Sequence, residues 1–249
     1  MKKNFEQSLI SVTHKDRVTS ISLNHKDRLN ALSSEMVEAL ILGLEEAVNI
    51  GANLVILRGE GRAFSAGFDL SNIEIESDAD LLHRFVRIEQ LLQTIYQLPI
   101  SSLTLIHGKC FGAAADIVSV CKYRIASPDT IFRMPGLQFG IVLGARRLAQ
   151  LVGSDKANEF LASSRVFNAE EGLKSVFLTE VHSFNDWPEI INKIALYSAN
   201  LSSTSKASLL KATRDDSQLD HDLATLVRSA IKPGLSKRIQ EFVKTQIKK

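Results

Sequence analysis

Two short hydrophobic runs, each leading into a glycine-containing segment, most constrain how this chain folds. The first run, residues 54–57, precedes residues 62–70, which read Arg-Ala-Phe-Ser-Ala-Gly-Phe-Asp-Leu. The second, residues 103–107, leads to Gly108 and then to residues 111–116. Apolar runs of this length bounded by glycine are typical of buried strands. After such a strand the backbone can present an N–H group, and two converging N–H groups form an oxyanion hole, which stabilises negative charge on a carbonyl oxygen. The sequence therefore predicts chemistry at a carbonyl group that depends more on backbone geometry than on any side chain.

The composition fits a globular protein and excludes several classes of function. Of the 249 residues, 45% are hydrophobic and 23% are charged, and 30 basic residues against 28 acidic ones leave a net charge of +2. So small a net charge gives no support to nucleic-acid binding, and no apolar run is long enough to predict a membrane span. Cys110 and Cys121 lack a CxxC spacing and the six histidines form no ligand pair. We therefore expect free buried thiols, no metal site and a cytoplasmic protein.

Alternating strand and helix patterns in the first half predict an α/β fold in which helices cover a sheet. Strands are expected at residues 9–14, 18–23, 53–58, 103–107, 123–126, 131–134 and 177–181. Helices are expected between a cap at Ser33 or Ser34 and Gly51, and at residues 80–98, 113–121, 144–152, 154–163, 169–174, 187–201, 204–212, 219–231 and 234–247. The mostly helical end of the chain predicts a core over residues 1–198 and a C-terminal helical region over residues 199–249.

Several strings point to one known family. Arg28-Leu29-Asn30-Ala31-Leu32 stands before the first helix, residues 63–70 read Ala-Phe-Ser-Ala-Gly-Phe-Asp-Leu, and Gly112 precedes a helix. Through these strings the chain resembles the crotonase superfamily, also called the enoyl-CoA hydratase/isomerase family, over most of its length. The resemblance implies a spiral of ββα units followed by a helical C-terminal region that makes trimer contacts, so a homotrimer or a dimer of trimers is expected. It also implies acyl-CoA substrates and a place in fatty acid metabolism, with coenzyme A present as part of the thioester rather than as a separate cofactor.

The same resemblance assigns roles to individual residues. The backbone N–H groups of Phe68 and Ala113 correspond to the two oxyanion donors, and Asp116 corresponds to the first catalytic glutamate of the hydratases. A carboxylate beside a bound thioester is suited to general base catalysis if burial raises its pKa; the alternative is an acid placed near a helix N-terminus for the dipole. The residues implied in substrate binding are Arg28, Ala31, Ala66, Gly67, Asp69, Leu70 and Gly112.

One position departs from the hydratase pattern. Hydratases carry a second glutamate after a proline, whereas here Met134-Pro135 is followed by Gly136, and the loop after it looks contracted by about three residues. A reaction that needs one carboxylate, such as isomerisation, hydrolysis or decarboxylation, is therefore favoured over hydration. The alternatives are a CoA-thioester-binding protein with lost or altered activity and, less favoured, a structural trimer without a ligand.

The remaining charged residues allow more than one interpretation. Arg146 and Arg147 at a helix N-terminus oppose the dipole, so they need a partner; surface acids are favoured over the tail of a dicarboxylic acyl group. By resemblance, Lys26 and Arg28 are the best-placed cations for the CoA phosphates, and Lys237 and Lys244 on the last helix could reach a neighbouring site. The favoured alternative for each of them alone is a solvated surface charge. His107 is interpreted as packed or hydrogen-bonded rather than catalytic. A carboxylate from Glu74, Glu76 or Asp78 would change the mechanism if it reached the site.

Overall fold

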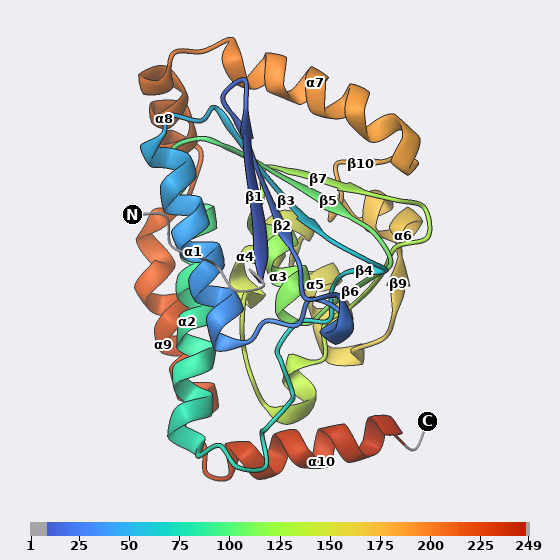
Figure 1. Ribbon diagram of the computed structural model, residues 1–249. Helices are drawn as coiled ribbons and strands as arrows, with labels where there is room; N and C mark the ends of the chain where they lie inside the picture. Colours follow the sequence, from blue (N-terminus) through green and yellow to red (C-terminus); the bar gives the residue numbers. More distant parts are fainter. Residues whose placement is uncertain (1–8, 248–249) are drawn as a thin grey trace.

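The computed structural model describes residues 9–247, and these form two sheets wrapped by helices (Figure 1). Residues 1–8 and 248–249, at the ends of the predicted core and helical region, lie outside the described residues. In spatial order the six-stranded sheet contains β1 (Ile10–Lys15), β2 (Val18–Leu23), β3 (Leu54–Gly59), β5 (Ser101–Ile106), β7 (Tyr123–Ala126) and β10 (Glu180–Val181). The four-stranded sheet contains β4 (Ala63–Ser65), β6 (Lys109–Phe111), β8 (Ile131–Arg133) and β9 (Phe167–Asn168).

The chain alternates between the two sheets, and this alternation builds a spiral. β3 and β4 precede one helix and β5 and β6 precede the next; within each pair the first strand joins the larger sheet and the second joins the smaller one. The central neighbouring strands of both sheets are parallel, whereas the β1–β2 hairpin and the β8–β9 pair are antiparallel. The predicted spiral of ββα units is confirmed.

The helices follow their predicted positions closely. They are α1 (Ser34–Asn49), α2 (Asp78–Tyr96), α3 (Ala113–Val120), α4 (Ala145–Val152), α5 (Ser154–Ser163), α6 (Ala169–Lys174), α7 (Trp187–Ala199), α8 (Ser203–Ala212), α9 (Leu219–Ala230) and α10 (Leu235–Ile247). Ser33 caps α1 by accepting the N–H of Met36. α2 begins two residues before its predicted start because Ser77 and Asp80 form a capping box.

Alternate residues of the central strands face opposite layers of helices. Leu54 and Ile56 of β3 pack with Trp187 of α7 on one face. Val55 and Leu57 point to the other face, into the core shared with α1, α2 and α3. This period of two explains why the central strands read as continuous hydrophobic runs, since both faces of a parallel sheet are covered.

Two strand predictions need correction. The strand expected at residues 177–181 is only Glu180–Val181, because Phe177 and Leu178 are buried in the core instead of pairing in the sheet. β4, β6 and β9 were not predicted. Each has two or three residues, which is too short to show a periodic pattern.

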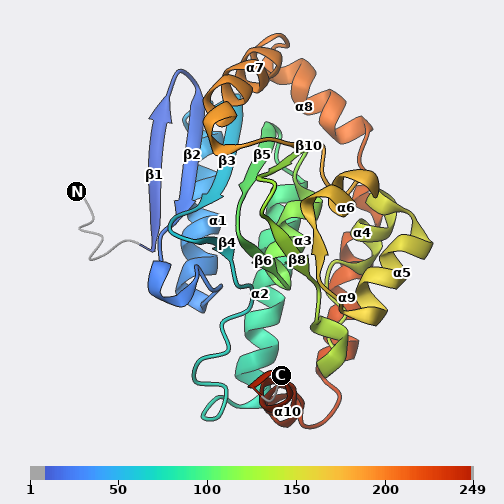
Figure 2. The same ribbon diagram turned by 90° about the vertical axis from the view of Figure 1, so that its right-hand side faces the viewer.

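The C-terminal helix α10 lies across the end of α2, below the rest of the molecule (Figure 2). Asp78, at the start of α2, accepts the backbone N–H groups of Gly234, Leu235 and Ser236 and so holds the start of α10. These hydrogen bonds lower the pKa of the Asp78 carboxyl. Leu235 and Ile239 of α10 are fully buried against α2 and α9. The helical end of the chain therefore covers one side of the spiral, and no helix within residues 9–247 has the length and apolar character to cross a bilayer.

Candidate active site

The loop after β4 is held in place by the Asn30 side chain. Asn30 is fully buried, and its amide donates to the carbonyl oxygens of Glu60, Ala63 and Phe64 at 2.9–3.2 Å. The backbone carbonyl oxygen of Asn30 accepts the hydroxyl of Ser65 at 2.7 Å, and the same hydroxyl accepts the N–H of Gly67 at 3.1 Å, which fixes the loop after β4. The Asn-Ala-Leu and Phe-Ser-Ala-Gly strings are thus two halves of one hydrogen-bonded unit.

Gly67 brings this loop against the start of α3. It has φ +81°, and a Cβ built on it would lie 2.2 Å from the carbonyl oxygen of Phe111 and 3.3 Å from the nitrogen of Ala113. Only glycine fits both this backbone conformation and this close approach. The peptide group between Gly67 and Phe68, which carries the Phe68 N–H, therefore lies beside the N–H of Ala113.

Neither of these two amides has an acceptor within the described part of the chain. In the parallel bridge between Leu32 and Phe68, the N–H of Leu32 donates to the carbonyl oxygen of Gly67, and the N–H of Asp69 donates to the carbonyl oxygen of Leu32. The N–H of Phe68 takes no part in this bridge and points away from Leu32. Ala113 is the first residue of α3, where an N–H has no intrahelical partner. Both residues line the same cavity. The two predicted donors are thus free and adjacent.

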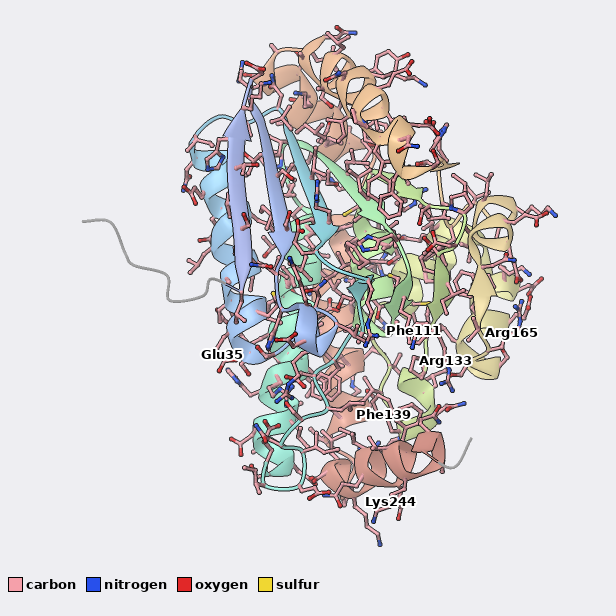
Figure 3. All side chains as sticks on the ribbon, turned by 45° about the vertical axis from the view of Figure 1, so that its right-hand side comes forward. Glu35, Phe111, Arg133, Phe139, Arg165 and Lys244 are labelled. Carbon is pink, nitrogen blue, oxygen red and sulfur yellow. The ribbon has the colours of Figure 1, made fainter. Side chains whose placement is uncertain are left out.

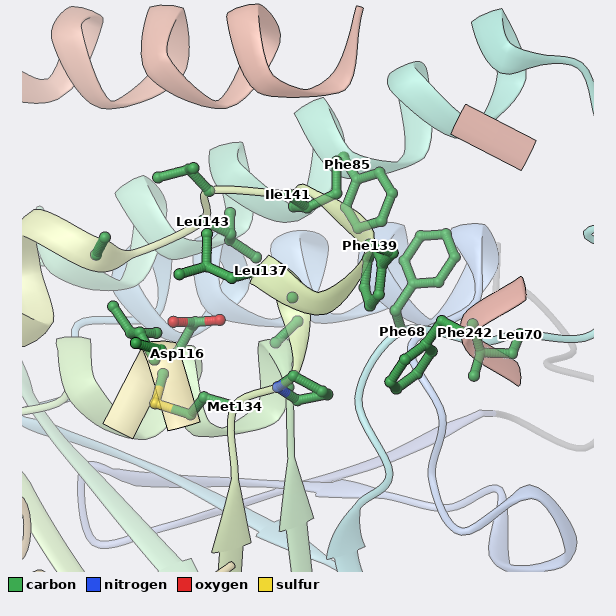
Figure 4. Close-up of a pocket in the computed structure, with 18 of the residues that line it drawn as sticks. Phe68, Leu70, Phe85, Asp116, Met134, Leu137, Phe139, Ile141, Leu143 and Phe242 are labelled. Atoms are coloured by element: carbon green, nitrogen blue, oxygen red, sulfur yellow. The ribbon is translucent and has the colours of Figure 1, made fainter. Parts of the chain in front are cut away.

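The cavity has a volume of about 300 Å³ and its walls are mostly apolar, with Asp116 and Asn158 as the polar side chains. Figure 4 shows Phe68, Phe85, Phe139 and Phe242 at one end, with Asp116, Met134 and Leu143 at the other. The aromatic end is part of the cluster that holds α10 in place, and the Phe68 and Phe85 rings are stacked with centroids 4.3 Å apart. The full lining is Ala66, Phe68, Leu70, Phe85, Gly112, Ala113, Asp116, Met134, Pro135, Gly136, Leu137, Phe139, Ile141, Val142, Leu143, Ala145, Asn158, Leu161, Ala162 and Phe242.

Asp116 is the sole acidic side chain in this lining, and it is 4% exposed. Its Oδ1 has no hydrogen-bond partner among residues 9–247. Gly144, with φ +64°, makes room for it, since a Cβ there would lie 2.3 Å from Oδ1. The pKa of Asp116 is raised to about 8, mainly because the carboxyl is buried. The positive charge of Arg147 lowers this pKa, and the negative charge of Glu89 raises it. A carboxyl with such a pKa exchanges a proton readily near neutral pH.

The structure brings most of the predicted site residues together. Ala66, Leu70 and Gly112 line the cavity with the three residues predicted to be catalytic, Phe68, Ala113 and Asp116. Four others do not line it: Arg28, Ala31, Gly67 and Asp69. Gly67 supports the loop from behind, and the Asp69 carboxylate accepts the N–H and hydroxyl of Ser71 at 2.9 and 2.7 Å.

Gly136 lies in the cavity wall and offers no side chain there. The three acids that would have changed the mechanism do not reach the cavity, because each is paired with another group or lies outside the lining. Glu76 pairs with Arg84 at 2.6 Å, Asp78 holds the start of α10, and Glu74 is exposed outside the lining. Within the described residues the cavity therefore contains one carboxyl group.

The prediction of a surface role for both arginines is wrong for Arg147. This side chain is 2% exposed and binds Glu89 of α2 at 2.5 and 2.8 Å and Asp222 of α9 at 2.9 Å. Burial of an arginine is tolerated because the carboxylates pair with it. Arg146 pairs with the buried carboxylate of Asp222 at 2.7 Å and with the surface carboxylate of Asp215 at 3.4 Å, so the interpretation with surface acids holds only for the contact with Asp215. Neither arginine lines the cavity.

Other polar predictions are resolved by their contacts. His107 is packed against Phe184 and Trp187, and its Nε2 lies 2.9 Å from the carbonyl oxygen of Gly61, which confirms a structural role. Lys244 projects from the outer side of α10, away from the body of the molecule (Figure 3). Both cysteines are buried free thiols, as predicted, and no cluster suited to a metal ion occurs among residues 9–247.

The sequence reasoning missed Arg84, which clamps the loop that carries the Phe68 amide. Its guanidinium lies 4.1 Å from the centre of the Phe68 ring, donates to the carbonyl oxygen of Asp69 at 2.6 Å, and pairs with Glu76. The signal was weak, because an arginine in a helix is usually a surface residue.

If the Phe68 amide is an oxyanion donor, as the family resemblance implies, we expect Arg84→Lys to lower kcat by about tenfold, because an ammonium cannot make all three contacts and the amide will shift. Arg87→Lys is the matched control: Arg87 lies on the same helix and pairs with Glu38, outside the cavity. Steady-state kinetics with an acyl-CoA checks this, and equal losses in the two variants would contradict a special role for Arg84.

Known proteins place the chain in a family. The family model described as enoyl-CoA hydratase/isomerase matches residues 13–242. The chain belongs to the enoyl-CoA hydratase/isomerase family. An enoyl-CoA hydratase/isomerase family protein from Bordetella parapertussis has a solved structure that superposes with a TM-score of 0.92 at 40% identity, covering 94% of this chain and 98% of that one.

Curated relatives of this enoyl-CoA hydratase/isomerase family member carry more than one reaction in their names. A probable enoyl-CoA hydratase of Mycobacterium tuberculosis is 30% identical over 193 residues, covering 75% of this chain and 77% of the relative. A mitochondrial Δ(3,5)-Δ(2,4)-dienoyl-CoA isomerase of Mus musculus is 26% identical over 170 residues, covering 62% of this chain and 51% of the relative. Membership of the family therefore leaves the reaction to be argued from the site.

Proposed function

We propose that this protein is an acyl-CoA isomerase that moves a proton along the acyl chain of an enoyl thioester. The supporting observation is the combination of two unengaged amides, those of Phe68 and Ala113, with the single buried carboxyl of Asp116 in one apolar cavity. The thioester oxygen would accept hydrogen bonds from the two amides, which stabilise the negative charge of an enolate. Coenzyme A enters as part of the substrate.

The chemistry balances with one carboxyl group. In a 3-enoyl thioester, the Asp116 carboxylate removes a proton from C2, and the electron pair moves onto the thioester oxygen to give a dienolate. The protonated Asp116 then returns the proton to C4 as the double bond forms between C2 and C3. No water is consumed, which agrees with a lining that has no second carboxylate to activate one.

The cavity favours an uncharged acyl group. No lysine or arginine lines it, and Arg146 and Arg147 are occupied by Asp222, Asp215 and Glu89. A second carboxylate on the acyl chain would therefore be buried without a partner, which is strongly unfavourable. This argues against decarboxylation and against dicarboxylic substrates.

The second candidate is a thioester-binding protein without turnover, and Gly136 favours it because one expected carboxylate is missing. One experiment separates the candidates. We expect the protein to convert trans-3-hexenoyl-CoA to its conjugated 2-isomer, followed by ultraviolet absorbance, and to leave methylmalonyl-CoA unchanged. Calorimetric titration with hexanoyl-CoA measures binding independently.

The outcomes have distinct meanings. Binding without conversion of any enoyl-CoA supports the binding protein, and absence of both overturns the proposal entirely. Rapid loss of carbon dioxide from methylmalonyl-CoA would contradict the preference for uncharged acyl groups.

A further inference from the structure

A cluster of buried charges lies outside the lining of the cavity. Arg147 of α4 is at its centre, between Glu89 of α2 and Asp222 of α9. The side chains of Arg147 and Glu89 are each 1% exposed, and that of Asp222 is 8% exposed. Arg146 adds a second contact to Asp222 at 2.7 Å. Two arginines thus face two buried acids, and the formal charges of these four groups cancel.

Two of the helices that carry this cluster, α2 and α4, pack against α3, the helix that carries Asp116. The Asp116 carboxyl lies against Gly144, the residue before α4, since a Cβ built on Gly144 would lie 2.3 Å from its Oδ1, and Arg147 is in the first turn of that helix. The charged or titratable groups of α2, α4 and β6 that act on Asp116 are Glu89, Arg147 and Cys110. The Cys110 thiol is neutral, because burial and the nearby Asp116 raise its pKa. Arg147 and Glu89 therefore remain as the charges that act on the carboxyl.

We infer that Arg147 and Glu89 are positioning residues that set the protonation state of Asp116 by holding opposite charges near it. The inference rests on the proposed role of Asp116 as the proton carrier. Charges separated by a buried, low-dielectric region interact over longer distances than they do in water. A balanced pair leaves Asp116 able to release its proton near neutral pH, whereas one uncompensated charge shifts that release in a direction fixed by its sign.

The two partners make opposite predictions. Removing the negative charge in Glu89→Gln leaves an uncompensated cation that favours the Asp116 carboxylate, so its pKa falls. Removing the positive charge in Arg147→Met favours the neutral acid, so its pKa rises. Asp222→Asn acts from farther away and should lower the pKa less than Glu89→Gln does.

The test is titration of the Asp116 carboxyl by NMR, with carbon-13-labelled aspartate in the full chain and the Asp116→Asn variant to assign the signal. We expect a downward shift of about one pH unit or more for Glu89→Gln and an upward shift of similar size for Arg147→Met. Glu38→Gln is the control, because Glu38 also pairs with an arginine of α2, Arg87, but lies outside the cavity. Its Asp116 titration should match that of the wild type.

The readout does not depend on turnover. Opposite shifts in the two variants support the inference even if no substrate is converted, and in that case only the proposed reaction fails. Shifts in the same direction, or none in either variant, overturn the inference. If Arg147→Met does not fold, the other two variants still decide the question. The Asp116 pKa should then fall slightly in Asp222→Asn and further in Glu89→Gln, and an unchanged pKa in both would overturn the inference.

Discussion

Asp116→Asn is expected to lower the isomerisation rate by about 10³-fold or more, because the amide cannot carry the proton between C2 and C4. The substitution keeps the shape of the side chain, so binding of hexanoyl-CoA should change little. Kinetics with trans-3-hexenoyl-CoA and calorimetry with hexanoyl-CoA measure the two effects separately. A variant that keeps more than about a tenth of the wild-type rate would show that another group moves the proton.

The same residue should set the pH dependence of the wild-type protein. With a pKa of about 8 in the folded state, Asp116 is protonated at neutral pH and becomes the required carboxylate as the pH rises. We expect kcat/KM to increase with pH and to level off above about pH 8. Asp116→Asn should abolish this dependence.

Asp116 should also reduce stability, and the sign follows from linkage. Its folded pKa is raised from 3.8 to about 8, so between these values the folded protein holds a proton that the unfolded chain has released. The free energy of unfolding therefore falls as the pH rises through this window. Asp116→Asn, which cannot ionise, should be more stable than the wild type at pH 8, by at least about 2 kcal/mol. Thermal unfolding across the window measures this; a lower Tm for the variant at pH 8 would contradict the burial cost.

The sequence predicted the parts of the fold and site that depend on local pattern. Two such features are a glycine after a buried strand, as at Gly67, and a carboxyl one turn into a helix, as at Asp116. They can be recognised in the sequence because residues close together in the chain create them. Three strands of the second sheet, β4, β6 and β9, were missed because two or three residues leave no periodic signal, whereas β8 was predicted.

The walls of the cavity could not be predicted because they come from distant segments. Phe85, Phe139 and Phe242 lie on three separate elements and meet only after α10 folds across α2. Arg147 was misplaced for the same reason: its partners Glu89 and Asp222 are far away in sequence, so nothing local indicates that a charged residue is buried. Side-chain pairing across helices is a tertiary property, whereas an unpaired N–H at the start of a helix is a local one.

Gly67→Ala is expected to give the other large effect, a loss of roughly 10²- to 10³-fold in kcat, which is the usual cost of losing one oxyanion donor. The added methyl would lie 2.2 Å from the carbonyl oxygen of Phe111, so the loop must move away from α3. The Phe68 amide moves with it, and the two donors no longer reach one oxygen. Binding of an apolar acyl chain should suffer less than the rate.

Gly153→Ala is the control for a substitution at a positive φ. Gly153 has φ +83°, close to the +81° of Gly67, but a Cβ on it meets nothing within 4 Å. Its ψ of 154° lies in a region essentially restricted to glycine, so alanine there carries a backbone cost of about 1–3 kcal/mol without a steric clash. A loss of rate in Gly67→Ala that Gly153→Ala does not show therefore comes from displacement of the loop and not from backbone strain alone.

A ligand comparison tests the donors without turnover. The wild type should bind acetoacetyl-CoA, whose enolate places negative charge on the thioester oxygen, more tightly than a CoA thioether that lacks this oxygen. Gly67→Ala should lose most of that preference and Gly153→Ala should keep it. If Gly67→Ala keeps both the preference and the rate, the amides of Phe68 and Ala113 do not hold the thioester oxygen, because their geometry cannot survive the displacement that the clash imposes.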